Sequence, residues 1–347
     1  MISMADAQVP SGGSDSSLGG AIDVHAHVIV PELLREVDPS EPWRPAILRD
    51  DGRHVIECGQ VRVRSAVHEL VDVEAILAIQ RSRGIERVVL CPWVGLLFYD
   101  VEPEEALRRC RLQNEGLARA RARCPERVSV LGSVPLQDPE LAAHELEVLL
   151  ATGEFSGVEV TASVNGTYLG DARFEPFWET AERAGALVFV HPATGRFSDP
   201  VFGQRYLHNL VGNPMETTVA AAHLVLGGVM ESHPALKVLL AHGGGAITAL
   251  RGRLRRGQRV VEAAGKVLTE SADRSIGRFL FDTVTHDSAV LRELVGVVGA
   301  DRVLLGSDYP FDMGDPDPLR TVREAGLDPA VQEALVRGNA ERLLKVG

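Results

Sequence analysis

Eight short apolar segments that alternate with amphipathic helical segments constrain the fold of this chain more than any other feature. The apolar segments are rich in Val, Leu and Ala and span residues 21–28, 87–92, 128–136, 157–164, 186–191, 237–242, 279–285 and 303–308. Predicted helices separate nearly all of them and include 104–124, 139–151, 174–184 and 216–233. Apolar strands that alternate with helices predict parallel pairing with both faces of the sheet covered. Eight such units predict an α/β fold, a (β/α)8 TIM barrel.

The domain organisation follows from where the alternation of strands and helices begins and where it is interrupted. Residues 1–20 lack apolar periodicity and predict a flexible N-terminal tail. No linker is evident between 21 and 347, which predicts a single barrel domain. The stretch at about 31–67 breaks the pattern and predicts a small insertion after strand one, with a hairpin of 46–49 and 54–57. In a barrel this insertion would lie over the mouth, where function resides.

Charge and cysteine usage argue against several classes of function. The formal net charge is −12 and the basic residues are scattered, which disfavours nucleic acid or an acidic membrane surface as a partner. The four cysteines form no C-x-x-C pair, so neither a zinc ribbon nor a dithiol redox site is indicated. Without a signal-peptide pattern or an apolar run of membrane-span length, a cytoplasmic protein with a small-molecule ligand is expected.

Polar residues end several of the predicted strands. His25 and His27 lie two apart on strand one, where alternation places both rings on one face, while His191, His242 and Asp308 end strands five, six and eight. Any one of these histidines alone suits a structural role with a satisfied hydrogen bond. The C-terminal ends of barrel strands meet at one mouth, so the five together predict a metal site.

Several motifs resemble those of the metal-dependent amidohydrolase superfamily, in the amidohydrolase-2 branch that contains aminocarboxymuconate semialdehyde decarboxylase. The resemblance extends from about residue 21 to 344. It rests on Asp23-Val24-His25-Ala26-His27, Val134-Pro135-Leu136-Gln137-Asp138, Val190-His191-Pro192, Asn213-Pro214-Met215-Glu216-Thr217-Thr218, Ala241-His242-Gly243-Gly244-Gly245, Leu305-Gly306-Ser307-Asp308-Tyr309-Pro310-Phe311 and Gly338-Asn339-Ala340.

The resemblance implies that His25, His27, His191 and Asp308 bind one Zn²⁺ per subunit, with Mn²⁺ as an alternative metal. It also implies that His242 is the acid/base beside a metal-bound water, with Asp308 contributing to catalysis. Two-metal members of the superfamily bridge their ions with a carboxylated lysine at the end of strand four, but strand four here, 157–162, contains no lysine. Its Glu159 suits either a bridging role or a structural role inside the barrel, and a single metal is favoured.

Four further residues are candidates for substrate binding. The resemblance implies that Arg64 binds a substrate carboxylate and that Arg253 reaches into the site of a neighbouring subunit. For both arginines a solvated surface charge is the alternative, and Arg253 lies in a basic helix face. Trp93 and Phe311 are candidate apolar walls, although such residues more often belong to a core or rim. Ala193-Thr194-Gly195 replaces the Trp-Asp-Met of resembling decarboxylases, which predicts an altered pocket.

The leading functional hypothesis is a zinc-dependent, non-oxidative decarboxylase, a carbon–carbon lyase, that acts on an unsaturated or aromatic carboxylic acid. The alternative is a metal-dependent hydrolase or hydratase that acts on a lactone, amide or enol acid at the same site, since fold and ligands do not separate these chemistries. A zinc-stabilised binding barrel without turnover is disfavoured because His242 is not needed to complete a four-ligand set. A homodimer is expected from Arg253 and the apolar helix 217–230.

Overall fold

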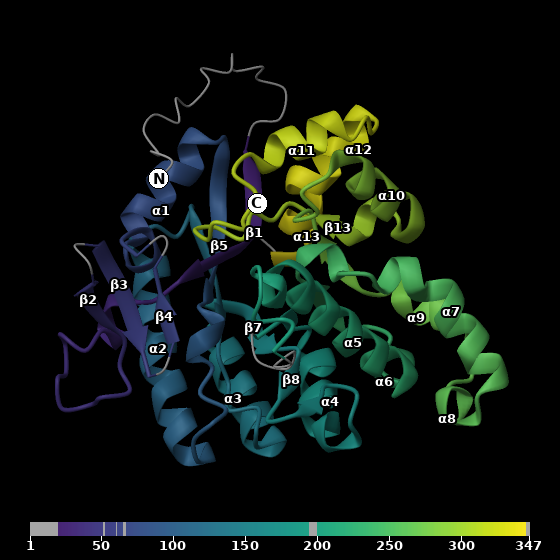
Figure 1. The fold of residues 1–347 in the computed structure, drawn as a ribbon, viewed down its shortest axis with the longest axis horizontal. Coiled ribbons are helices and arrows are strands. Elements are labelled where there is room, and N and C mark those ends of the chain that lie inside the picture. Colours follow the sequence, from purple (N-terminus) through teal and green to yellow (C-terminus); the bar gives the residue numbers. More distant parts are fainter. Residues whose placement is uncertain (1–19, 51–52, 60, 65–66, 194–199, 345–347) are drawn as a thin grey trace.

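Eight parallel strands form the centre of the molecule, as the sequence predicts (Figure 1). The computed structural model describes residues 20–50, 53–59, 61–64, 67–193 and 200–344, so the predicted tail lies outside the described residues except for Gly20. The strands, in their spatial order, are β1 (Ala21–Val28), β5 (Ile85–Pro92), β6 (Val128–Gly132), β7 (Phe155–Thr161), β10 (Leu187–His191), β11 (Lys237–Leu240), β12 (Leu280–Asp282) and β13 (Val303–Leu304).

Backbone hydrogen bonds bring the first and last strands together. The amide of Val24 donates to the carbonyl of Leu305 at 2.9 Å, and the amide of His27 donates to the carbonyl of Tyr309 at 2.8 Å. The amide of Asp308 donates to the carbonyl of His25 at 2.8 Å. These bonds close the (β/α)8 barrel and place the segment after β13 beside the two histidines of β1.

The late strands end earlier than the sequence predicts. Strand 237–242 ends at Leu240, and strand 303–308 ends at Leu304. His242 and Asp308 follow these strands with φ values of 57°, in the left-handed region that a β-strand does not admit. Both side chains therefore project from the loops at the barrel mouth rather than from the strands themselves.

Helices connect and cover the strands. They are α1 (Val73–Ser82), α2 (Pro103–Arg123), α3 (Pro139–Ala151), α4 (Glu175–Ala184), α5 (Asn213–Leu226), α6 (Val229–Ser232), α7 (Ile247–Val260), α8 (Glu262–Gly265), α9 (Ala272–Ile276), α10 (Ser288–Val298), α11 (Pro318–Glu324), α12 (Pro329–Glu333) and α13 (Asn339–Leu344). The helix predicted at 216–233 is divided in two, because Gly228 adopts a left-handed conformation with φ 82° between α5 and α6. None of the helices in the described ranges is long and apolar enough to cross a membrane.

The buried apolar side chains form two layers. An inner layer fills the barrel and includes Val24, Leu131 and Phe189. An outer layer lies between strands and helices and includes Phe174 and Trp178, whose indole Nε1 donates to the carbonyl of Leu169 at 3.0 Å. Because apolar residues occupy both faces of the strands, the polar side chains at the mouth are held on a rigid scaffold.

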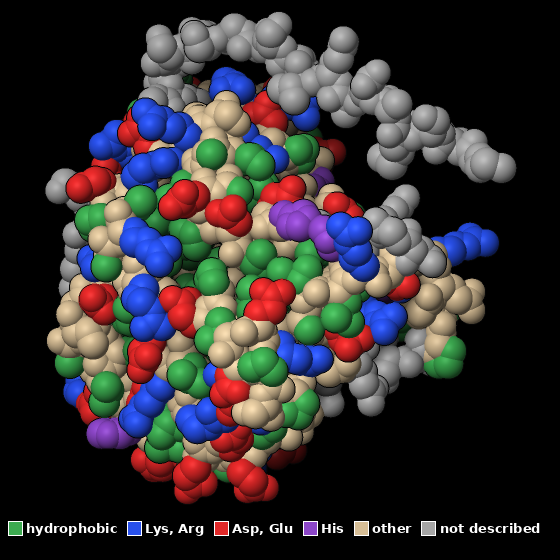
Figure 2. All heavy atoms as spheres, turned by 90° about the vertical axis from the view of Figure 1, so that its left-hand side faces the viewer, with side chains coloured by type: hydrophobic (Ala, Val, Ile, Leu, Met, Phe, Trp, Pro, Cys, Tyr) green, Lys and Arg blue, Asp and Glu red, His purple; other side chains and the backbone are tan. Residues whose placement is uncertain are grey.

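The insertion after β1 folds as a small antiparallel sheet. It consists of β2 (Ala46–Asp50), β3 (Arg53–Cys58) and β4 (Val61–Val63), which confirms the predicted hairpin and adds a third strand. The turn residues Asp51 and Gly52 lie outside the described residues. A separate two-stranded ribbon, β8 (Ser163–Val164) and β9 (Thr167–Tyr168), follows β7. On the face drawn in Figure 2, acidic and basic side chains are intermixed.

Replacement of Asp138 by Ala is expected to lower the free energy of unfolding by about 1 kcal/mol, because it removes an N-cap. The Asp138 carboxylate accepts a hydrogen bond from the backbone amide of Leu141 at 3.1 Å, in the first turn of α3. Urea unfolding followed by circular dichroism measures the change. Asp138→Ser keeps a capping oxygen and should recover most of the stability, whereas an equal loss in both variants would contradict the capping role.

Candidate metal centre

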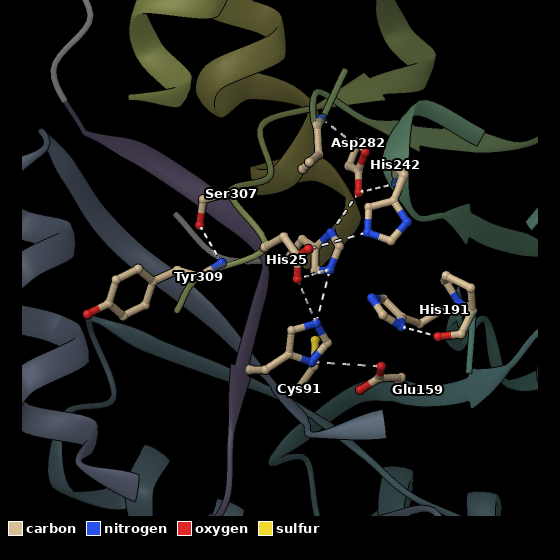
Figure 3. Close-up of polar contacts among 12 residues, drawn as sticks. His25, Cys91, Glu159, His191, His242, Asp282, Ser307 and Tyr309 are labelled. Carbon is tan, nitrogen blue, oxygen red and sulfur yellow. Dashed lines mark hydrogen bonds and ion pairs between the residues drawn. The ribbon is translucent and has the colours of Figure 1, made fainter. Parts of the chain in front are cut away.

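The five polar residues predicted at the strand ends lie together at the barrel mouth. Figure 3 labels three of them, His25, His191 and His242. The Nε2 atoms of His25 and His27 are 3.0 Å apart, and each lies 3.3 Å from Asp308 Oδ1. The His191 ring centroid lies 5.2 Å from that of His25 and 4.8 Å from that of His27. His242 Nε2 lies 3.3 Å from Asp308 Oδ2, on the side of the cluster that faces the cavity.

The hydrogen bonds of three imidazoles set which ring nitrogen is free. Nδ1 of His25 donates to Asp282 at 2.7 Å, Nδ1 of His27 donates to the carbonyl of Pro92 at 3.1 Å, and Nδ1 of His191 donates to the carbonyl of Pro192 at 2.9 Å. Each bond leaves Nε2 as the lone-pair nitrogen. His191 Nε2 is buried and has no hydrogen-bond partner among the described residues.

This arrangement fits a divalent cation. The Nε2 lone pairs of His25 and His27 face each other at 3.0 Å, a separation that requires a shared proton or a metal ion between them. Three neutral imidazoles and one carboxylate form a donor set suited to zinc or another first-row divalent metal. His25, His27, His191 and Asp308 would hold such an ion, and their side chains are almost fully buried.

The buried charges set the protonation of the cluster without metal. Burial lowers the pKa of His25, but Asp308 and Asp282 outweigh it and raise that pKa to about 10. Burial also lowers the pKa of His27, and it holds the pKa of His191 well below its ordinary value. One proton on His25 thus offsets part of the carboxylate charge, and a bound cation would replace it.

Asp282, which is not among the residues predicted for the site, supports two of these histidines. It ends β12 and is completely buried. Besides the bond from His25, it accepts hydrogen bonds from the backbone amides of His242 at 3.0 Å and Gly243 at 2.7 Å. It therefore fixes both the ring orientation of His25 and the loop that carries His242. The signal was present in the sequence, because Asp282 is a carboxylate at the end of an apolar strand.

Asp282→Asn is expected to weaken metal binding by about 10- to 100-fold, the range typical for loss of a partner that orients a ligand. Asparagine has the same size as aspartate, but it replaces one of the two carboxylate oxygens with an NH₂ group. Both of these oxygens accept hydrogen bonds in the native protein. Competition with a chromogenic chelator measures the affinity. Asp301→Asn, at an exposed position beside Arg302, is the control. An unchanged affinity in Asp282→Asn would contradict the orienting role.

A second buried carboxylate, Asp23, joins β1 to the segment after β13. Its Oδ1 accepts from the backbone amides of His25 and Ser307, both at 3.0 Å, and its Oδ2 accepts from Gln80 Nε2 at 2.7 Å. Burial raises the pKa of Asp23 to about 6 despite these bonds. This network positions the strand that carries His25 and His27, and nothing local in the sequence predicts it.

Glu159, on β7, lies on the inner side of the cluster. It is completely buried, and its Oε1 lies 3.9 Å from His27 Nδ1. Neither of its carboxyl oxygens has a hydrogen-bond partner among the described residues. Burial raises the pKa of Glu159 well above its ordinary value.

A cavity of about 490 Å³ adjoins His242 and Asp308. Of the candidate substrate residues, Phe311 has its ring 5.4 Å from that of His27, and Trp93 is buried in the outer core layer after β5. Arg64 is exposed and pairs with Asp50 at 2.9 Å, and Arg253 is exposed on α7. Neither arginine is among the described residues that line the cavity. In the altered segment after His191, Thr194 and Gly195 lie outside the described residues.

Comparisons with known proteins identify the family. Residues 99–346 match the family model described as amidohydrolase. The 2-amino-3-carboxymuconate-6-semialdehyde decarboxylase of Dictyostelium discoideum is 34% identical over 319 residues, which cover 90% of this chain and 79% of the relative. The 5-carboxyvanillate decarboxylase of Sphingomonas paucimobilis shares the fold with a TM-score of 0.81 and 24% identity, over 94% of this chain and 99% of that one.

A third similar protein is the dihydroxybenzoic acid decarboxylase of Polaromonas sp. JS666, solved with bound manganese and the inhibitor 2-nitroresorcinol. Its TM-score is 0.79 at 24% identity, and the match covers 94% of this chain and 97% of that one. At this identity the two solved structures establish the shared fold. The family model and the relative from Dictyostelium discoideum go further, and they show that this chain belongs to the amidohydrolase family.

Proposed function

We propose that this protein is a metal-dependent, non-oxidative decarboxylase of an aromatic or unsaturated carboxylic acid. The observation that carries the proposal is the cluster of buried histidines around Asp308 at the cavity: the Nε2 atoms of His25 and His27 lie 3.3 Å from its Oδ1, and His191 and His242 lie close beside them. His25, His27, His191 and Asp308 would hold one zinc or manganese ion per chain. Such an ion supplies Lewis acidity, which stabilises negative charge on a bound substrate oxygen, and lowers the pKa of a bound water.

His242 is the residue that moves the proton in this proposal. Decarboxylation breaks the bond between carbon and the carboxylate, releases CO₂ and leaves the electron pair on carbon, where a proton must form the new C–H bond. His242 lies at the cavity, and an imidazole can hold and deliver that proton near neutral pH. Asp308 Oδ2, 3.3 Å from His242 Nε2, orients the ring.

The relatives support a decarboxylase over the hydrolase or hydratase alternative. Besides the relative from Dictyostelium discoideum, the gamma-resorcylate decarboxylase of Polaromonas sp. is 28% identical over 76% of this chain. One structural neighbour binds manganese together with a ring inhibitor, which supports a divalent metal without selecting zinc. Phe311, beside His27, is proposed as an apolar wall for the substrate, whereas the place of Trp93 in the outer core layer favours a structural role for it. Arg64 is proposed as a carboxylate ligand that would have to leave Asp50.

The reaction is tested with metal-loaded protein and a panel that includes 2,6-dihydroxybenzoate, 5-carboxyvanillate and 2-amino-3-carboxymuconate-6-semialdehyde. The proposal predicts that at least one acid yields one equivalent of CO₂ and the product with hydrogen in place of the carboxylate, without net addition of water. Elemental analysis of the purified protein identifies the metal and should find about one equivalent per chain. Ring opening, or hydration with no release of CO₂, would instead support the alternative.

We also propose a homodimer, in which Arg253 of one subunit reaches the cavity of the other. The supporting observation is that Arg253 is exposed on α7, and that Thr248 and Ala249, at the start of this helix, line the cavity. Sedimentation velocity should show a dimer, and Arg253→Ala should raise KM without dissociating it. An active monomer would contradict this assembly but not the decarboxylation itself.

A further inference from the structure

The outer wall of the cavity is built by the segment after β12 and by α10. Val284, Thr285 and His286 lie in the loop, and Val290, Glu293 and Leu294 lie on one face of the helix. They adjoin His242 and Asp308, which line the same cavity. A substrate whose carboxylate lies at the metal centre would direct its remaining atoms towards walls such as this one.

His286 shares an unusual backbone conformation with the two residues already assigned a role in this cavity. His242, Asp308 and His286 all have φ values of 57°, in the left-handed region that side chains rarely adopt. A strained backbone conformation of this kind persists only where surrounding contacts hold the residue in place, and it is most frequent at functional sites. Two of the three residues serve the metal and the proton in the proposed reaction, and the third has no role yet.

The residues beside His286 hold it in place. The amide of Thr285 donates to the carbonyl of Thr283 at 2.7 Å, and Thr285 Oγ1 donates to the carbonyl of Asp287 at 3.0 Å. The Asp287 side chain in turn accepts from the amides of Ala289 at 2.7 Å and Val290 at 3.1 Å, and so caps α10. His286 is therefore fixed between two anchored neighbours.

His286 differs in chemical character from the other residues of this cavity wall. Apart from His242, it is the one basic side chain among the described residues that line the cavity. No hydrogen bond to its ring is found within the described part of the chain, and the residue is exposed. An imidazole N–H can donate a hydrogen bond to an anionic or a hydroxyl oxygen.

We propose that His286 is a substrate-positioning residue that binds a second oxygen substituent of the acid, away from the carboxylate that is lost. The contact would orient the substrate so that its reacting carbon faces His242. This inference rests on the proposed decarboxylation for its catalytic meaning. Recognition of the second oxygen substituent is nevertheless measurable by binding alone, without turnover.

The test measures binding of three probes to the metal-loaded protein by calorimetry. Benzoate has a single carboxylate, 3-hydroxybenzoate adds a hydroxyl, and benzene-1,3-dicarboxylate adds a second carboxylate. The wild type should bind one of the two substituted probes about ten-fold more tightly than benzoate, the gain expected from one hydrogen bond. The probe that binds more tightly than benzoate shows whether the second substituent of the substrate is a hydroxyl or a carboxylate.

The decisive variants are His286→Gly and His286→Asn. Glycine adopts the left-handed conformation without cost, so His286→Gly should unfold at the same or a higher temperature than the wild type, yet lose the ten-fold preference with benzoate affinity unchanged. Asparagine tolerates this conformation and keeps a donor, so His286→Asn should retain part of the preference. His144→Ala, at an exposed position on α3, is the control.

Two outcomes would overturn the inference: equal affinity of the wild type for all three probes, or a preference that survives in His286→Gly. Failure of the decarboxylase proposal has a different signature. In that case no acid releases CO₂, while the difference between wild type and His286→Gly in binding remains. If turnover is found, His286→Gly should raise KM more than it lowers kcat, since the proton is supplied by His242.

Discussion

His191→Ala is expected to remove the metal from the purified protein and to abolish turnover with it. The His191 ring lies against both histidines of β1, and its Nε2 is buried without a hydrogen-bond partner among the described residues. A buried lone pair without a partner is costly, which indicates that the side chain is placed to bind an ion. Loss of one of four ligands should exceed the 10- to 100-fold effect of losing an orienting partner, so we expect more than about 100-fold weaker binding.

Metal content by elemental analysis and CO₂ release measure the two effects. His144→Ala removes an exposed histidine from α3 and should leave metal content and activity unchanged, which excludes adventitious binding to surface histidines. The barrel should remain folded by circular dichroism, because His191 ends β10 and its core neighbours are unaltered. A full equivalent of metal in a folded His191→Ala protein would show that the ion is held by other residues.

The barrel could be predicted from the sequence because its signals are local. Each strand appears as a short apolar run and each helix as an amphipathic segment, and the short connections between them permit parallel pairing. The ends of these elements were less predictable. The predicted strand 128–136 ends at Gly132, and the predicted helix 216–233 breaks at Gly228, because turns and left-handed residues override the apolar pattern.

The metal centre could be predicted in part for the same reason. Residues that end strands of one barrel meet at one mouth, so His25, His27, His191, His242 and Asp308 were identified without knowledge of their distances. Asp23 was not singled out, because its partners Gln80 and Ser307 are 57 and 284 residues away in the chain. The substrate contacts proposed for Arg64 and Arg253 would depend on flexible side chains and on a second subunit, which strand patterns do not encode.

His242→Ala is expected to lower kcat by about 100- to 10,000-fold while one equivalent of metal stays bound, since general acid–base catalysis contributes in this range. His242 Nε2 lies 3.3 Å from Asp308 Oδ2, whereas the Nε2 atoms of His25 and His27 each lie 3.3 Å from the other carboxylate oxygen, Oδ1, and 3.0 Å from one another. The proposed function assigns the proton to His242 and the metal to His25, His27, His191 and Asp308. His25, His191, His242 and Asp308 nevertheless lie close enough together to form an alternative ligand set, so metal content is the informative measurement.

The backbone conformation of His242 and the hydrogen bond from its amide to Asp282 determine which substitutions are informative at this position. Its left-handed backbone makes alanine unfavourable, so His242→Asn, which tolerates this conformation, separates loss of the imidazole from loss of the loop geometry. Asp282, which binds the backbone amide of His242, should hold the loop in both variants. If both variants keep the metal and lose turnover, the imidazole carries the proton. If the metal is lost together with the imidazole, His242 is a ligand, and the proton must come from another group at the cavity.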